Sequence, residues 1–197
     1  MKRFNRTWLR EHPGAILHIR NNASAYGWMI RKAIGSWGNH NALIIRWYDD
    51  RDYIGEAIAP IAKLTHLTEY EARINDGESE VKVYLPVGYT KELGLWVSTY
   101  WCRHIKNSPY DYWGIIQLPR KLTAQWIARK MGWQWAEKQA GTEWGRWCTQ
   151  AVQEAYLNNP QDPMDLYKKL NATPRTHENR VSEGVFYEYT SAAIVDV

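Results

Sequence analysis

Two apolar runs on either side of a charged turn constrain the fold of this chain most. The runs are Asn41–Tyr48 (NALIIRWY) and Tyr53–Ala59 (YIGEAIA), and the residues DDRD lie between them. Short runs rich in Ile, Tyr and Trp are typical of strands, and a short charged turn between two of them predicts an antiparallel hairpin. Pro60 is expected to end the second strand, because proline cannot donate to a sheet ladder.

Other segments have strand or helix patterns that extend this hairpin into a domain. Strands are predicted at Ala15–Ile19 and Ser79–Leu85, with a final one within Gly184–Val197. Helical spacing predicts helices at Ala25–Ile34 (ended by Gly35), near Leu67–Ala72, and at Lys91–Lys106, Leu122–Ala140, Cys148–Leu157 and Met164–Leu170. The short polar stretch Asn171–Glu183 is the only candidate linker. Together these patterns indicate one α+β domain over residues 1–197, with a mainly antiparallel sheet.

Composition and charge narrow the classes of partner. The chain has 12 Trp and 13 Tyr but only 2 Phe, and such amphipathic aromatic residues suit half-buried sites and binding surfaces. The net charge is +4, and the basic residues are scattered rather than clustered, so nucleic acid is not an expected partner. A mildly basic surface would equally suit an acidic cell-wall polymer or an anionic membrane surface.

Targeting and metal motifs are not found in the sequence. The charged N-terminus is followed by no apolar run and no stretch approaches about 18 apolar residues, so we expect no signal peptide and no transmembrane segment. The protein is then expected to be cytoplasmic as synthesised. With two cysteines, no CxxC spacing and no Gly-rich phosphate loop, neither a disulfide scaffold, a metal site nor a cofactor is expected.

Cys148 is the most informative candidate for chemistry. It follows Gly145-Arg146-Trp147 and begins a predicted helix. The positive end of a helix dipole lowers the pKa of a thiol and favours the nucleophilic thiolate, and free N–H groups there can hold an oxyanion. A small buried apolar role would suit Cys148 equally well, and this alternative stays open. Cys102 lies within a predicted helix and is expected only to pack.

His40 and Glu56 are the candidate partners of the thiol. His40 precedes the first hairpin strand, where an imidazole could accept a thiol proton and later donate it to a leaving group. Glu56 lies in the second strand among apolar residues, and a buried carboxylate there would need a partner such as His40. The alternative is a loop histidine without a role, and because the chain has six His, any single one has a low prior of being the base. Glu56 could point outward, since the hairpin register is uncertain by one residue.

Taken together, several segments resemble the circularly permuted branch of the NlpC/P60-type papain-like hydrolases, in which the histidine precedes the cysteine. The matching segments, in family order, are Gly14–Leu17, Asn39–Ile44, Tyr53–Ala59 with its Glu56-Ala57 pair, Ser108–Tyr112, Trp147–Val152 and Asp162–Leu166. The chain departs from the family pattern at Asn39, at Asn41-Ala42 and at Thr149-Gln150, and these departures bear on substrate preference.

The resemblance implies a papain-like core, in which a helix carrying Cys148 packs on an antiparallel sheet carrying His40. It also implies amide hydrolysis through an acyl-enzyme on Cys148, commonly on peptidoglycan stem peptides, with Glu56 orienting His40. The substrate is then a peptide or amide, such as a cell-wall fragment, and the source a bacterium or a phage. Tyr110, Asp111 and Trp147 are expected to shape the substrate cleft, although Tyr110 could as easily belong to the core. A thioester-based acyltransferase and an inactive binding module are the alternative functions.

Overall fold

A central antiparallel sheet organises the molecule. The computed structural model describes residues 1–46, 52–111, 148–158 and 174–197. In these residues six strands pair in the order β5-β4-β3-β2-β6-β7, and every neighbouring pair is antiparallel. Their bounds are β2 Ile16–Asn21, β3 His40–Arg46, β4 Asp52–Ala57, β5 Ala62–His66, β6 Ser79–Pro86 and β7 Phe186–Glu188. The predicted α+β class with an antiparallel sheet is confirmed.

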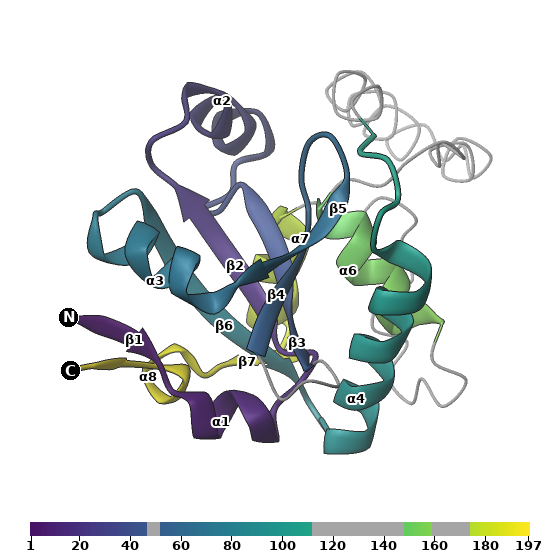
Figure 1. Cartoon of the computed structure of the whole chain (residues 1–197). Coiled ribbons are helices and arrows are strands. Elements are labelled where there is room, and N and C mark those ends of the chain that lie inside the picture. Colours follow the sequence, from purple (N-terminus) through teal and green to yellow (C-terminus); the bar gives the residue numbers. More distant parts are fainter. Residues whose placement is uncertain (47–51, 112–147, 159–173) are drawn as a thin grey trace.

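Helices cover both faces of the sheet (Figure 1). One face packs against α4 (Lys91–Tyr100), the π-helical turn η1 (Trp101–Ile105) and α6 (Cys148–Leu157). The other face packs against α3 (Leu67–Asn75), with α1 (Arg6–Glu11) and α8 (Thr190–Ala193) nearby. The helix carrying Cys148 therefore packs on the strand carrying His40, as expected.

Two apolar cores result, one on each face of the sheet. Leu43 and Ile45 point into the core beneath α4 and α6, whereas Ala42 and Ile44 point into the core beneath α3. Successive strand residues face opposite sides of a sheet. A central strand covered on both faces must therefore be apolar throughout, which explains why the segment ALII shows no polar alternation.

Two further helices and a two-stranded sheet complete the described fold. Helix α2 spans Ala25–Ile34 as predicted; the Ser24 side chain accepts from the Gly27 N–H at its start, and Gly35, at φ 63°, ends it. Helix α7 spans Pro174–Ser182. Strands β1 (Lys2–Phe4) and β8 (Ile194–Asp196) pair with each other. No helix in the described ranges is both long and apolar enough to cross a membrane.

Most predicted elements are confirmed, and the errors are informative. The predicted linker Asn171–Glu183 is wrong, because residues Pro174–Ser182 form α7. The predicted single helix Lys91–Lys106 changes to π-helical geometry at Trp101, and β5 was not anticipated. The predicted final strand is divided between β7 and β8 by α8. The predicted helices Leu122–Ala140 and Met164–Leu170 and the hairpin turn lie outside the described residues.

Candidate active site

Cys148 lies where α6 meets the beginning of β3. It is the first described residue of α6, a helix that contacts β3 and β4, and it is only 6% exposed. Three groups interact with its sulfur: the His40 imidazole, the backbone N–H of Asn41 and the hydroxyl of Thr149. The Cys148 Sγ to Thr149 Oγ1 distance is 3.8 Å. Contact with a histidine and two further hydrogen-bond donors favours the thiolate form of a cysteine.

His40 bridges the thiol and a buried carboxylate. It is the first residue of β3, and its side chain is 14% exposed. Its Nε2 lies 3.1 Å from Oε2 of Glu56, and the same imidazole also hydrogen-bonds with Cys148. The structure thus brings together the three side chains that were singled out in the sequence as a possible nucleophile, base and orienting group.

The hairpin register explains why Glu56 reaches His40. Ala42 of β3 pairs with Glu56 of β4. His40 lies two residues before Ala42 in β3, so its side chain points to the same face of the sheet as Glu56. The Glu56 side chain is 1% exposed and accepts hydrogen bonds from the hydroxyls of Thr65 and Tyr70 as well as from His40. A buried carboxylate with this many donors is fully partnered, which removes the cost of an isolated buried charge.

The electrostatics of this cluster favour an ion pair. Burial alone would lower the pKa of His40, but the adjoining Cys148 and Glu56 outweigh burial and raise the pKa to about 10. Burial alone would raise the pKa of Cys148, but the charge and hydrogen bond of His40, with the donors from Asn41 and Thr149, lower it. Burial opposes ionisation of Glu56 too, yet its bonds to His40, Thr65 and Tyr70 lower the pKa to about 2. All three shifts favour the charged forms: the thiolate of Cys148, the imidazolium of His40 and the carboxylate of Glu56.

The predicted substrate-binding residues are less well defined. Tyr110 packs partly buried against the core beneath α6, and its N–H donates to the carbonyl of Pro60. Asp111 is buried. Trp147 lies outside the described residues. A role of these residues in binding substrate remains a prediction.

Cys102 contrasts with Cys148. It packs partly buried against the core beneath α4, and burial raises its pKa to about 12. The two free cysteines of this chain therefore lie in opposite electrostatic environments.

Sequence reasoning missed the residues that support the triad. Thr65 and Tyr70 hold Glu56 from β5 and α3, and neither stands in a motif that would have marked it. Asn41 and Thr149 each follow a predicted site residue directly, which is the signal that could have pointed to them. Glu178 was hidden in the supposed linker, and its Oε1 accepts from the Ser36 hydroxyl and from the N–H groups of Trp37 and Gly38. These bonds anchor the loop that leads into His40.

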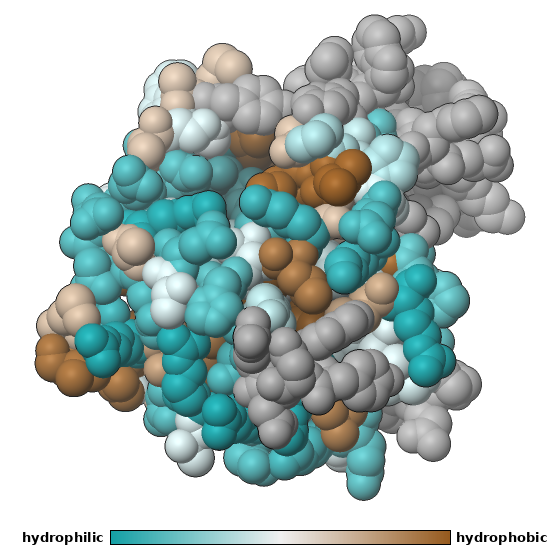
Figure 2. Space-filling model, in the orientation of Figure 1, coloured by the Kyte–Doolittle hydropathy of each residue, from teal (hydrophilic) through white to brown (hydrophobic). Residues whose placement is uncertain are grey.

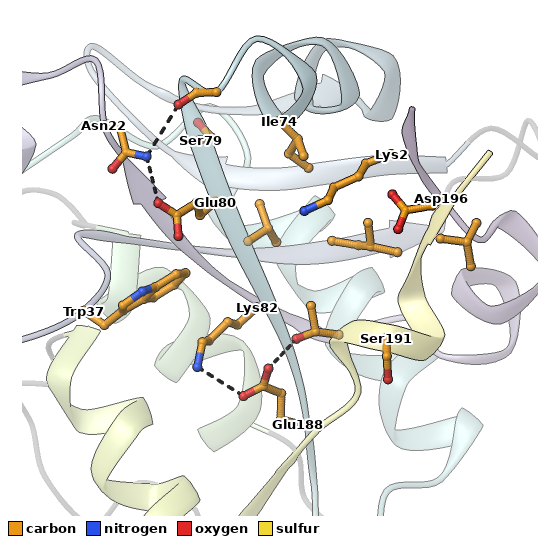
Figure 3. A pocket seen from close by; sticks show the side chains of 15 residues that line it. Lys2, Asn22, Trp37, Ile74, Ser79, Glu80, Lys82, Glu188, Ser191 and Asp196 are labelled. Carbon is orange, nitrogen blue, oxygen red and sulfur yellow. Dashed lines mark hydrogen bonds and ion pairs between the residues drawn. The ribbon is translucent and has the colours of Figure 1, made fainter.

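A surface groove lies elsewhere on the molecule. It has a volume of about 960 Å³ and runs between β6, α8 and the small β1–β8 sheet (Figure 3). Its charged side chains are mixed in sign, and Lys82 is already paired with Glu188 at 3.3 Å. None of Cys148, His40 and Glu56 lines this groove. We place the candidate site at the cysteine, because perturbed titratable groups in contact mark chemistry better than groove volume does.

Comparisons with known proteins give a fold and no family. No model of a known protein family matches the sequence, and no curated protein matches it significantly. Five solved chains match in structure, among them the crystal structure of metalloprotein yiiX from Escherichia coli O157:H7, DUF1105. That match covers 93% of this chain and 91% of that chain, with a TM-score of 0.53 and 15% sequence identity. At this identity the similarity shows a shared fold alone.

The expected membership of the permuted NlpC/P60-type family is therefore wrong. No family model supports it, and the structural match is to yiiX. The segments behind the expectation are short, and they surround a cysteine at a helix start and a histidine at a strand start. These segments describe the local setting of the two residues and do not establish a family.

Proposed function

We propose that this protein is a cysteine hydrolase that cleaves an amide bond through an acyl-enzyme on Cys148. The observation that carries the proposal is the contact of Cys148 with His40, together with the 3.1 Å contact of His40 Nε2 with Glu56 Oε2. A nucleophile, a base in contact with it and a third group that orients the base are the general signature of covalent catalysis.

The arrangement supports a defined sequence of proton transfers. The Cys148 thiolate attacks the amide carbonyl, and the His40 imidazolium gives its proton to the leaving nitrogen as the C–N bond breaks. The products of this half-reaction are a free amine and a thioester on Cys148. Neutral His40 then takes a proton from water, which attacks the thioester, releases the carboxylic acid and restores the ion pair. Glu56 holds the ring in position and stabilises its charged form.

The proposed reaction uses only the side chains of Cys148, His40 and Glu56. The yiiX structure is described as that of a metalloprotein. Within the described part of the present chain, no group of three or more His, Cys, Asp or Glu side chains could hold a metal ion.

The narrower expectation of cell-wall stem peptides rested on the family resemblance, so the proposal extends only to amides and peptides. A cytoplasmic location as synthesised remains part of the proposal.

Selective alkylation tests the nucleophile before any substrate is known. Iodoacetamide should label Cys148 much faster than Cys102 at pH 7, because only Cys148 has a lowered thiol pKa. Peptide mapping by mass spectrometry distinguishes the two sites within one sample. Equal, slow labelling of both cysteines would overturn the proposal and favour the inactive binding module.

Turnover tests the reaction. Wild-type protein, Cys148→Ala and the matched control Cys102→Ala are incubated with a mixture of peptides and with soluble cell-wall muropeptides, and new primary amines are detected by fluorescamine. Amine release is expected from wild type and Cys102→Ala, and should fall at least about 10³-fold in Cys148→Ala. Undiminished release by a folded Cys148→Ala protein would refute the proposal. An added amine or alcohol acceptor reveals any acyl transfer.

A further inference from the structure

A second chain of polar side chains reaches Cys148 independently of Glu56. Its members are Glu178 on α7, His18 on β2, Asn41 on β3 and Thr149 on α6. The side chains of His18, Asn41 and Thr149 are all fully buried. Burying so many polar groups is costly unless each is hydrogen-bonded, so their arrangement requires an explanation that the triad does not provide.

The geometry of the chain is continuous. His18 Nε2 lies 3.0 Å from Glu178 Oε1, and His18 Nδ1 lies 2.7 Å from Asn41 Oδ1. Asn41 Nδ2 donates to Thr149 Oγ1 at 2.9 Å, and Thr149 Oγ1 lies 3.8 Å from the Cys148 sulfur. The register of the sheet produces the central link, because His18 and Asn41 are directly paired across β2 and β3 and so point to one face.

From His18 to Thr149, the donors in this chain point toward the sulfur. An amide N–H can only donate, so Thr149 accepts from Asn41 and keeps its own hydroxyl hydrogen for another acceptor. The Cys148 sulfur is the acceptor at hand. On the other side of Asn41, its Oδ1 accepts from His18 Nδ1. The bond between His18 Nε2 and Glu178 lies at the far end of the chain and runs the opposite way, so the aligned bonds begin at His18. Hydrogen bonds aligned in one direction polarise one another.

We propose that Asn41 and His18 are positioning residues that hold the Thr149 hydroxyl as a donor to the Cys148 sulfur. The hydroxyl then stabilises the thiolate by a contact that the His40–Glu56 pair does not provide. The biological meaning of this inference rests on the proposed cysteine hydrolase function, but its physical content concerns only the acidity of the thiol.

Charged and titratable side chains from several elements face Cys148 at one end of this chain of hydrogen bonds and His18 near the other end. The thiol interacts with His40 from β3, which is itself bonded to Glu56 from β4, and Tyr70 from α3 lies near enough to affect it. Around His18, Glu178 is also bonded to Arg175 at 3.1 Å, and the rings of Trp37 and Tyr84 pack on the imidazole. Gly38 makes this packing possible, since a Cβ there would lie 2.6 Å from the His18 ring.

The test measures the rate of Cys148 alkylation by iodoacetamide against pH, which reports the thiol pKa without any substrate. Thr149→Val keeps the side-chain shape but removes the hydroxyl, and Thr149→Ser keeps the hydroxyl. We expect Thr149→Val to raise the apparent thiol pKa by about one unit, which slows alkylation about tenfold below that pKa. Thr149→Ser should stay close to wild type.

Asn41→Leu tests the positioning role. This near-isosteric change retains the backbone N–H that contacts the sulfur but cannot donate to Thr149. It should raise the thiol pKa in the same direction as Thr149→Val, and the double variant should show no further shift. Additive shifts would overturn the role of Asn41. If Asn41→Leu does not fold by circular dichroism, the Thr149→Val and Thr149→Ser pair still decides whether the hydroxyl acts on the sulfur.

The outcomes separate this inference from the proposed function. If Cys148 in the wild-type protein is no more reactive than Cys102, the proposed nucleophile fails. If Cys148 is reactive but Thr149→Val has the wild-type pH profile, only the present inference is overturned. A raised thiol pKa in Thr149→Val, with a wild-type pKa in Thr149→Ser, supports the inference. General damage to the fold would not depend on whether residue 149 carries a hydroxyl.

Discussion

At the scale of single residues, the charge state of Cys148 and His40 determines what the site can do. The pKa of the thiol is lowered and that of the imidazole is raised, so over a range of pH both groups are charged at once. This state provides a nucleophile without a prior proton transfer and a proton for the leaving amine. A free thiol beside a neutral imidazole would have to generate both during the reaction.

A bell-shaped dependence of kcat/KM on pH is expected from this pair. Activity should rise as the thiolate forms, at a pH below 9.0, the ordinary pKa of the thiol. It should fall as pH rises through about 10, because His40 then loses the proton that the leaving group needs. A pH–rate profile from pH 4 to 11 on an amide substrate measures both limbs, whose apparent pKa values belong to the pair.

Glu56→Gln provides the matched control for the alkaline limb. Gln keeps the shape of Glu56 but removes the negative charge that helps to raise the pKa of His40. The alkaline limb should therefore move to lower pH by about one unit or more, while the protein still folds. An alkaline limb that stays in place would show that Glu56 does not support the protonated ring.

At the scale of elements, tertiary contacts stabilise helix α7 more than the helix propensity of its own residues does. The helix PRTHENRVS is polar almost throughout, which led to its interpretation as a linker. Its residue Glu178 accepts hydrogen bonds from His18, from Ser36 and from two backbone N–H groups of the loop before β3. Propensity and periodicity alone cannot reveal a helix that is stabilised by such tertiary bonds.

Glu178→Gln should destabilise the fold by about 1–3 kcal/mol, because several charge-assisted hydrogen bonds weaken when the carboxylate is lost. Glu183→Gln is the matched control: each glutamate pairs with an arginine three residues earlier, but the Glu183 side chain is 54% exposed. The control should change stability by less than about 0.5 kcal/mol. Urea unfolding at pH 7 compares the two, and equal effects would contradict the anchoring role of Glu178.

At the scale of the whole molecule, the triad is assembled from two layers. His40 and Glu56 belong to the sheet, whereas Cys148 belongs to a helix that covers one face of it. The site therefore depends on the packing of α6 against the sheet. Figure 2 shows a largely hydrophilic face with a hydrophobic patch near its centre, over the region of β4 and β5.

Acid should weaken the fold through Glu56. The pKa of Glu56 falls from 4.5 to about 2 on folding. Its contribution to the free energy of unfolding is therefore fully present above pH 4.5 and is lost as pH falls through about 2. The shift corresponds to about 3 kcal/mol. The stability difference between wild type and Glu56→Gln in urea unfolding should be largest at pH 7 and should narrow below pH 4. Glu69→Gln, at an exposed glutamate paired with Arg73, should show no such narrowing.

The sequence alone determined the hairpin, α2, α6 and the α+β class. These elements depend on local apolar spacing, on a charged turn and on caps such as Gly35, all of which are visible in a short window. It also singled out Cys148, His40 and Glu56, because a thiol at a helix start and a carboxylate in an apolar strand are locally unusual. The family resemblance was wrong, since no family model matches the chain.

Only the tertiary structure decided which side chains meet. The pairing of Ala42 with Glu56 put the carboxylate and His40 on one face, and a slip of one residue would have reversed it. Packing of α6 on the sheet brought Cys148 to His40 across 108 residues of chain, as it brought Thr149 to Asn41. Such contacts arise from the burial of distant surfaces against one another, and no local pattern of residues encodes them.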